Sequence, residues 1–187
     1  MFTEQLAAAA DLGPDRADGR PSGSGTPTRI EPMKRRHIRG VVAIENQVNH
    51  KPWSESLFLG ELRMPTSRIY NVALDAHRVL GFCGLMLITD EGHITNVAVD
   101  PTVRRLGIAR RLLGETIREA IDRGVTSLTL EVRMSNKGAQ ELYRRFGFFP
   151  GGIRHRYYAE LNEDALIMWA HDVSTEEYAK RLEGLGV

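Results

Sequence analysis

The stretch NVAVDPTVRRLGIARRLL, residues 96–113, reads as a strand, a short loop and the beginning of a helix. Val97 and Val99 alternate as in a strand, and beyond the loop apolar residues recur at helical spacing, at positions 108, 112, 113, 117, 120 and 121. The small residues Gly107 and Ala109 leave backbone amides accessible, and a helix start carries partial positive charge, so an anion would bind there through the backbone. The stretch therefore predicts a cradle for a phosphate or pyrophosphate group.

Three arginines, Arg104, Arg105 and Arg110, add positive charge to this loop. The pattern is not a P-loop, because no Gly-Lys-Ser/Thr follows, and it lacks the three spaced glycines of a dinucleotide-binding fingerprint. A plain strand-turn-helix connection is the alternative that spacing alone leaves open. The loop resembles motif A of the Gcn5-related N-acetyltransferases, Arg/Gln-x-x-Gly-x-Gly/Ala, through Arg104, Gly107 and Ala109. In that family the loop holds the pyrophosphate of acetyl-CoA, so the resemblance implies acetyl-CoA as the acyl donor.

Composition places the chain among globular proteins. Its 187 residues are 42% hydrophobic and 26% charged, which favours one domain with a real core. The net charge of +1 argues against bulk electrostatic binding to nucleic acid or a membrane surface. The longest nearly apolar run, residues 79–88, is too short to span a bilayer. With one cysteine, Cys83, and no basic region before the first apolar run, we expect no internal disulfide, no secretory signal and a cytoplasmic location.

The order of predicted elements indicates a single α/β domain at residues 29–171, with a mixed, mostly antiparallel twisted sheet flanked by helices. Residues 1–28, which include PSGSGTP, have linker composition and are expected to be a disordered extension. Residues 172–187 form a polar C-terminal tail that could add a helical turn or two. Strands are expected up to residue 31 and at 69–74, 79–88, 93–99, 126–133, 153–158 and 164–170. Helices are expected at 33–47, from Ser54 as N-cap to before Pro65, at 108–123 and at 136–146.

The strand SLTLEVR, residues 127–133, alternates between polar and apolar residues, so Glu131 projects away from the apolar face. Its alternative interpretation is a solvated carboxylate. The following helix carries Asn136, Gln140 and Tyr143 on one stripe. If strand and helix flank a common cleft, carboxylate, amide and phenol converge there. A place in the core is equally compatible with the spacing of Tyr143.

The run LEVRMSNKGAQELYRRFGF, residues 130–148, is similar to the LEVR-x-x-N-x-x-A-x-x-LY-x-x-x-GF segment of the bacterial ribosomal-protein-alanine acetyltransferases, the RimI type. Further matches, which extend the similarity to about residues 28–170, are Pro52-Trp53-Ser54-Glu55, Arg154-x-Arg156-Tyr157-Tyr158 and the segment 163–168. Two departures stand out. The family's His-Pro-Trp appears with one inserted residue, as His50-Lys51-Pro52-Trp53, and Ala109 replaces the commoner glycine.

The resemblance implies roles for individual residues. Glu131 would be the proton acceptor and Tyr143 the proton donor. The acetyl-CoA contacts would be Asn136, the backbone of Val97, Ala98 and Val99, and the loop made of Arg105, Leu106, Gly107, Ile108, Ala109 and Arg110. The acceptor would be a protein or peptide N-terminus, namely the N-terminal alanine of a small-subunit ribosomal protein.

Amine chemistry favours the same acceptor. A free α-amine has a pKa of about 7.7–8.0 and a lysine about 10.4, so a single carboxylate acting through water suits a peptide N-terminus better. A lysine, a small-molecule amine, or acyl-CoA binding without turnover remain as alternatives. Trp53, Tyr157 and Tyr158 would form an aromatic rim for the first residues of the peptide, with ordinary core packing as the alternative. The six histidines show no ligand spacing, so we expect no metal.

Overall fold

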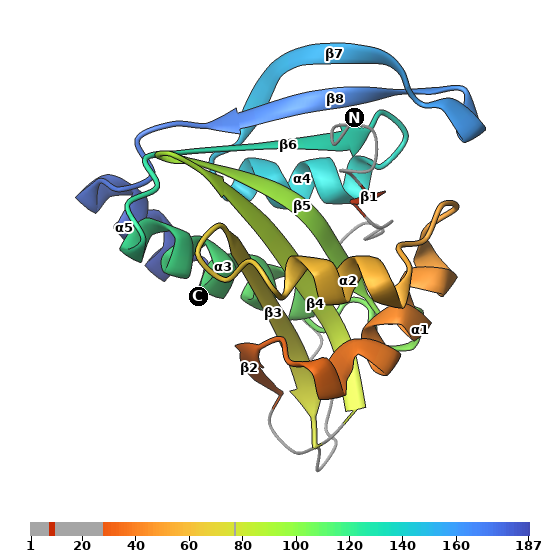
Figure 1. Cartoon of the computed structure of the whole chain (residues 1–187). Helices are drawn as coiled ribbons and strands as arrows, with labels where there is room; N and C mark the ends of the chain where they lie inside the picture. The colour runs from red at the N-terminus through yellow and green to blue at the C-terminus, as the bar shows by residue number, and fades with distance from the viewer. Residues whose placement is uncertain (1–7, 10–27, 77) are drawn as a thin grey trace.

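The computed structural model describes residues 8–9, 28–76 and 78–187. Seven strands form one twisted sheet in the order β2-β3-β4-β5-β6-β8-β7, and an eighth, β1, pairs with β5 (Figure 1). The strands are β1 (Ala8–Ala9), β2 (Arg29–Pro32), β3 (Arg68–Asp75), β4 (Arg78–Ile88), β5 (Glu91–Val99), β6 (Ser127–Arg133), β7 (Phe149–Tyr158) and β8 (Glu163–Ala170). The helices are α1 (Ile38–Val48), α2 (Glu55–Glu61), α3 (Ile108–Asp122), α4 (Lys137–Arg145) and α5 (Glu176–Gly184). Most of the pairs are antiparallel, which confirms the predicted α/β class.

The sheet opens between β5 and β6, because the two strands diverge. These two strands run parallel and pair only where Glu91–His93 meets Ser127–Thr129. Gly92 allows this close approach, because a Cβ there would lie 2.7 Å from Leu128 Cδ2. Farther along β5, where β6 no longer pairs with it, Ala8–Ala9 lies parallel beside Asn96–Val97. The parted strands form the V-shaped part of the sheet in which the candidate site lies.

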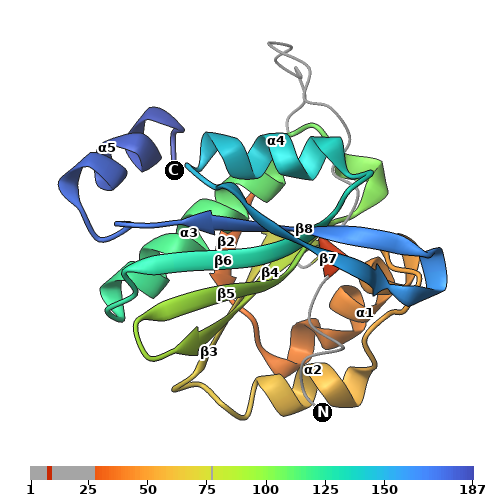
Figure 2. The same ribbon diagram turned by 90° about the horizontal axis from the view of Figure 1, so that it is seen from above.

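Helices cover both faces of the sheet (Figures 1 and 2). One core lies under α1 and α2, where Phe58 packs edge-on against Phe82 and Tyr70, with ring centroids 5.5 and 6.4 Å apart. The other core lies under α3, α4 and α5, and Leu112 and Phe146 are fully buried in it. The helix boundaries follow local signals: the Ser54 hydroxyl accepts from the Leu57 amide, which confirms the predicted N-cap.

Two segments differ from the sequence-based expectation. The last hairpin is longer, because β7 begins at Phe149 and not near residue 153. Pro150 fits an edge strand, which needs no ladder donor on its outer side, and the register shifts between Pro150 and Gly152. Residues 172–187, expected as a polar tail, contain the nine-residue helix α5, and its Tyr178 and Leu182 are buried in the core.

The expected disordered extension, residues 1–28, lies outside the described residues apart from Ala8, Ala9 and Thr28. Among the helices that the structure describes, none combines the length and the apolar character needed to cross a membrane.

Candidate active site

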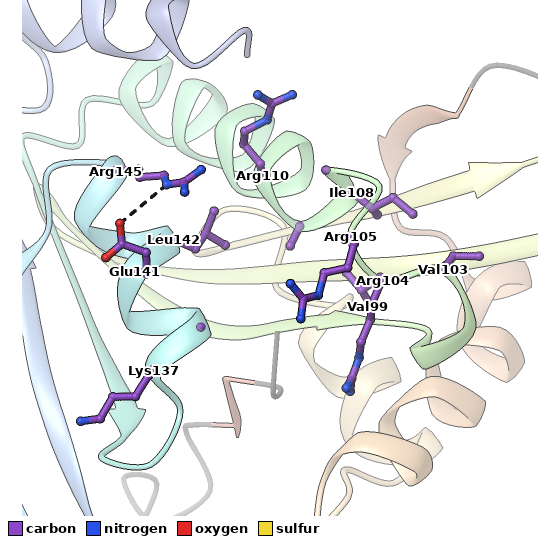
Figure 3. A pocket seen from close by; sticks show the side chains of 13 residues that line it. Val99, Val103, Arg104, Arg105, Ile108, Arg110, Lys137, Glu141, Leu142 and Arg145 are labelled. Atoms are coloured by element: carbon purple, nitrogen blue, oxygen red, sulfur yellow. Dashed lines mark ion pairs between the residues drawn. The ribbon is translucent and has the colours of Figure 1, made fainter. Parts of the chain in front are cut away.

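The loop between β5 and α3 forms one wall of a cavity of about 290 Å³, and α4 forms the opposite wall (Figure 3). The lining residues are Val99, Val103, Arg104, Arg105, Gly107, Ile108, Ala109, Arg110, Lys137, Gly138, Glu141, Leu142 and Arg145. Five of these side chains are cationic and one is a carboxylate, so the cavity attracts an anion. The lining thus includes six residues of the predicted phosphate loop.

The backbone of this loop is shaped for anion binding. Gly107 has φ +73° and Arg105 has φ +71°, both in the left-handed region, and α3 begins directly afterwards. Left-handed residues before a helix start turn successive amides in one direction, and the first amides of a helix have no intrahelical acceptor. The residues present therefore fit the pyrophosphate of a coenzyme A donor.

Two cationic lining residues were missed by the sequence analysis. Lys137 and Arg145 of α4 are among the lining residues, together with Glu141, whose Oε1 lies 3.8 Å from Arg145 Nε (Figure 3). Positions 137, 141 and 145 follow a four-residue spacing, so they occupy one helical stripe. That spacing was the signal that could have revealed them.

Other residues expected to contact the donor do not line this cavity. Leu106 is 55% exposed and is not among the lining residues, whereas Val97 and Ala98 are buried in β5. Asn136 is buried as the N-cap of α4, and its Oδ1 accepts a hydrogen bond from the Ala139 amide at 3.0 Å. Asn96, beside this part of β5, is 1% exposed, and neither polar atom of its side chain has a hydrogen-bond partner among the described residues.

Glu131 is buried at the point where the strands part. It is 4% exposed, so the alternative of a solvated carboxylate does not hold. Its Oε1 lies 3.0 Å from Arg154 Nη1 on β7, and its Oε2 lies 3.0 Å from His93 Nε2 on β5. The sequence analysis identified neither partner, because no local spacing connects them to Glu131. The carboxylate is thus placed between a nitrogen group from β5, the strand next to β6, and one from β7, which lies beyond β8.

Tyr143 lies on the α4 side of the sheet and is 1% exposed. Its ring packs against Phe148 with centroids 5.7 Å apart. Burial, with smaller contributions from Cys83 and Tyr158, raises the pKa of Tyr143 well above its ordinary value. The phenol therefore keeps its proton throughout the physiological pH range and is a hydrogen-bond donor.

The three residues expected to form an aromatic rim occupy different environments. Tyr157 and Tyr158 are half-buried and pack edge to face at 5.3 Å, and the Arg154 guanidinium lies 5.5 Å from the Tyr157 ring centre. Burial and the Glu131 charge raise the pKa of Tyr157 to about 12. Trp53 is 6% exposed and packs against Phe58 at 5.3 Å, so its ring belongs to the core under α1 and α2.

A buried carboxylate fixes the loop between α1 and α2. Glu45 is fully buried and accepts a hydrogen bond from the Trp53 amide at 3.1 Å. Burial raises the pKa of Glu45. Within the described residues no group of three or more His, Cys, Asp or Glu side chains is arranged to hold a metal ion.

Comparison with known proteins places this geometry in context. The family model described as "Acetyltransferase (GNAT) family" matches residues 38–148. The [ribosomal protein bS18]-alanine N-acetyltransferase of Salmonella typhimurium is 41% identical over 128 residues, which span 67% of this chain and 84% of that protein. The corresponding protein of Escherichia coli strain K12 is 38% identical over the same shares of the two chains.

A solved structure shows that the similarity to these acetyltransferases extends to the fold. The crystal structure of the ribosomal-protein-S18-alanine N-acetyltransferase from Escherichia coli superposes with a TM-score of 0.71 at 32% sequence identity. The superposition covers 78% of this chain and 94% of that chain.

Proposed function

We propose that this chain, which belongs to the Gcn5-related N-acetyltransferase (GNAT) family and is an acetyl-CoA-dependent N-acetyltransferase, modifies a protein N-terminus. The acceptor is the N-terminal alanine of a small-subunit ribosomal protein, in keeping with the activity for which the Salmonella and Escherichia coli relatives are named. A cytoplasmic location follows from such an acceptor. The transferase domain is residues 29–171, preceded by residues 1–28, and residues 172–187 add helix α5, whose buried face completes the core of that domain.

The observation that carries this proposal is the buried carboxylate of Glu131 at the parting of β5 and β6. Acetyl-CoA supplies the thioester whose carbonyl carbon the amine attacks. Glu131 accepts, through water, the proton that the α-ammonium group must lose before attack. An α-amine with a pKa of about 8 needs only modest help near neutral pH, so one carboxylate is sufficient.

The remaining residues orient the donor and stabilise charge. The cationic cavity and the amides before α3 hold the pyrophosphate. To the segment Val97, Ala98 and Val99 we assign the polarisation of the thioester carbonyl, through the backbone amides that face away from β4, and to Asn136 a contact with the donor at the start of α4. The Tyr143 hydroxyl protonates the departing sulfur, which leaves as a thiol. The phenol regains its proton from the attacking nitrogen, which loses its second proton as the amide forms. Tyr157 and Tyr158, with the loop that carries Trp53, border the acceptor.

Two matched peptides test the acceptor. One has a free N-terminal alanine and no lysine, and the other is N-terminally blocked and contains one lysine. We expect acetyl transfer from acetyl-CoA to the first peptide alone. Transfer to the second peptide would assign a lysine acceptor. If neither peptide is acetylated although acetyl-CoA still binds, the acceptor is a small-molecule amine or the chain is a binding module without turnover.

A further inference from the structure

His93 lies where the pairing between β5 and β6 ends. It is the last residue of β5 that pairs with β6, and its partner in the register is Thr129. Glu131 lies two residues farther along β6, hence on the same face as Thr129 and just beyond the last strand pairing. The imidazole and the carboxylate therefore meet where the strands part, with His93 Nε2 and Glu131 Oε2 3.0 Å apart.

Both atoms are buried and lack aligned hydrogen bonds. The His93 side chain is 13% exposed and that of Glu131 is 3% exposed. Despite their separation of 3.0 Å, Nε2 and Oε2 do not have the alignment of a hydrogen bond, and neither forms one with another described residue. Buried polar atoms are nearly always satisfied, so an imidazole and a carboxylate left without aligned hydrogen bonds require an explanation. The other carboxylate oxygen is held by Arg154.

The two nitrogen partners of Glu131 differ in chemistry. The Arg154 guanidinium stays charged at every physiological pH, so it fixes the carboxylate but takes no proton from it. An imidazole exchanges its proton near neutrality. His93 is thus the partner of Glu131 that is suited to receive a proton.

We propose that His93 is a positioning residue that acts through Glu131 and relays the acceptor's proton away from it. The inference rests on the proposed role of Glu131 as the base. The acceptor ammonium loses its proton through water to the Glu131 carboxylate, which becomes a carboxylic acid. Neutral His93 then takes that proton on Nε2, the carboxylate is restored, and the resulting imidazolium returns a proton to solvent before the next turnover.

The benefit of the relay follows from reference proton affinities. Moving a proton from an α-amine to an ordinary carboxylate is unfavourable by roughly 5,000-fold, from pKa values of about 8 and 4.3. Moving it to an ordinary imidazole, with a pKa of about 6.5, is unfavourable by only about 30-fold. A relay to imidazole therefore leaves the carboxylate ready for the next turnover.

Charged and titratable groups from several elements surround the pair. Arg154, Tyr157 and Tyr158 face Glu131 from β7. On the side of α2 and β3, the Thr95 hydroxyl of β5 forms a hydrogen bond with the Tyr70 hydroxyl. The Tyr70 hydroxyl in turn donates a hydrogen bond to the Glu61 carboxylate. The remaining neighbours, which act on this network, are Arg68, Arg133 and Glu163. His93 and Glu131 are the pair in which an imidazole meets a carboxylate directly at the parting of the strands.

The test is the pH dependence of kcat/KM for His93→Gln in the full chain, with the free-alanine peptide and saturating acetyl-CoA. Glutamine keeps a polar side chain of similar reach but cannot take up a proton. We expect His93→Gln to be about 10–100-fold slower than the wild type at pH 8. The ratio of wild type to variant should fall as the pH is lowered, because an imidazole that already carries its second proton cannot accept another.

Two controls separate a relay from a structural role. His171→Gln, the same substitution at an exposed histidine stacked on Trp169, should follow the wild-type profile. In a Glu131→Gln background, His93→Gln should cause no further loss, since the two residues act as one unit. A rate ratio that stays constant with pH, or losses that simply multiply in the double variant, would overturn the relay.

The outcome for the acceptor is read separately. If the wild type modifies the lysine peptide or a small amine, the proposed function fails. The His93 profile is then measured with that acceptor, because the relay depends on Glu131 and not on the identity of the amine.

Discussion

Replacing Tyr143 by phenylalanine isolates the contribution of a single hydroxyl. The residue is 1% exposed, and the ring that packs against Phe148 is retained in the variant. The hydroxyl forms no hydrogen bond with a described residue, so its removal leaves no protein group without a partner. We therefore expect the free energy of unfolding to change by less than about 1 kcal/mol, a shift of a few degrees in Tm for a chain of this size.

The effect on turnover should be much larger. A buried donor aimed at charge that develops in the transition state contributes about 2.7–4 kcal/mol, so kcat should fall roughly 100- to 1,000-fold. The affinity for acetyl-CoA should change little, because the donation strengthens as the sulfur becomes a thiolate. Initial rates of coenzyme A release, calorimetric binding of acetyl-CoA and thermal unfolding together measure the three quantities.

Tyr178→Phe is the matched control. Tyr178 is also buried, but its hydroxyl donates to the Phe146 carbonyl at 2.8 Å, outside the candidate site. Its loss should cost about 1–3 kcal/mol of stability and leave kcat unchanged. A Tyr143→Phe enzyme whose kcat stays within threefold of the wild type would refute the reasoning, and so would equal losses of kcat in both variants.

Three other predictions concern separate parts of the molecule. Since burial raises the pKa of Tyr143, the donor stays protonated as pH rises, and kcat of the wild type should show no decline that depends on Tyr143 up to about pH 10. A decline near pH 9 that Tyr143→Phe abolishes would contradict this. Arg110→Ala should weaken acetyl-CoA binding about 10- to 100-fold, and titrations at low and high salt should show the deficit shrinking as salt screens the phosphates. Phe58→Ala should lower the free energy of unfolding by about 3–5 kcal/mol in urea titrations, and a loss under 1 kcal/mol would mean that the core under α1 and α2 tolerates the cavity.

The parts of the site that the sequence predicted are those set by local geometry. The loop that lines the cavity before α3 follows from a glycine before a helix start, and the orientation of Glu131 follows from the two-residue period of a strand. The partners of Glu131 could not be found in this way, because His93 and Arg154 reach it from other strands through the register of the sheet. Conversely, Trp53 has the sequence context of a substrate residue, but its ring is enclosed by a core that only the three-dimensional packing defines.

Weak local signals explain the remaining differences in the fold. The Pro-Gly-Gly run at residues 150–152 is typical of a turn and not of a strand, so the sequence analysis placed the start of this strand too late. In α5 the polar majority hides Tyr178 and Leu182, which are four residues apart and share the buried face.

The opening between β5 and β6 also has a consequence for stability: the free energy of unfolding should depend on the concentration of acetyl-CoA. A short stretch of pairing joins β5 to β6, so a coenzyme bound, as proposed, between the loop before α3 and helix α4 would brace both halves of the sheet. By mass action, acetyl-CoA at one hundred times its dissociation constant would add about 2.7 kcal/mol to the folded state. Where acetyl-CoA is abundant, the acetyl-CoA-bound enzyme would therefore resist heat and proteolysis better than the free enzyme does where acetyl-CoA is scarce.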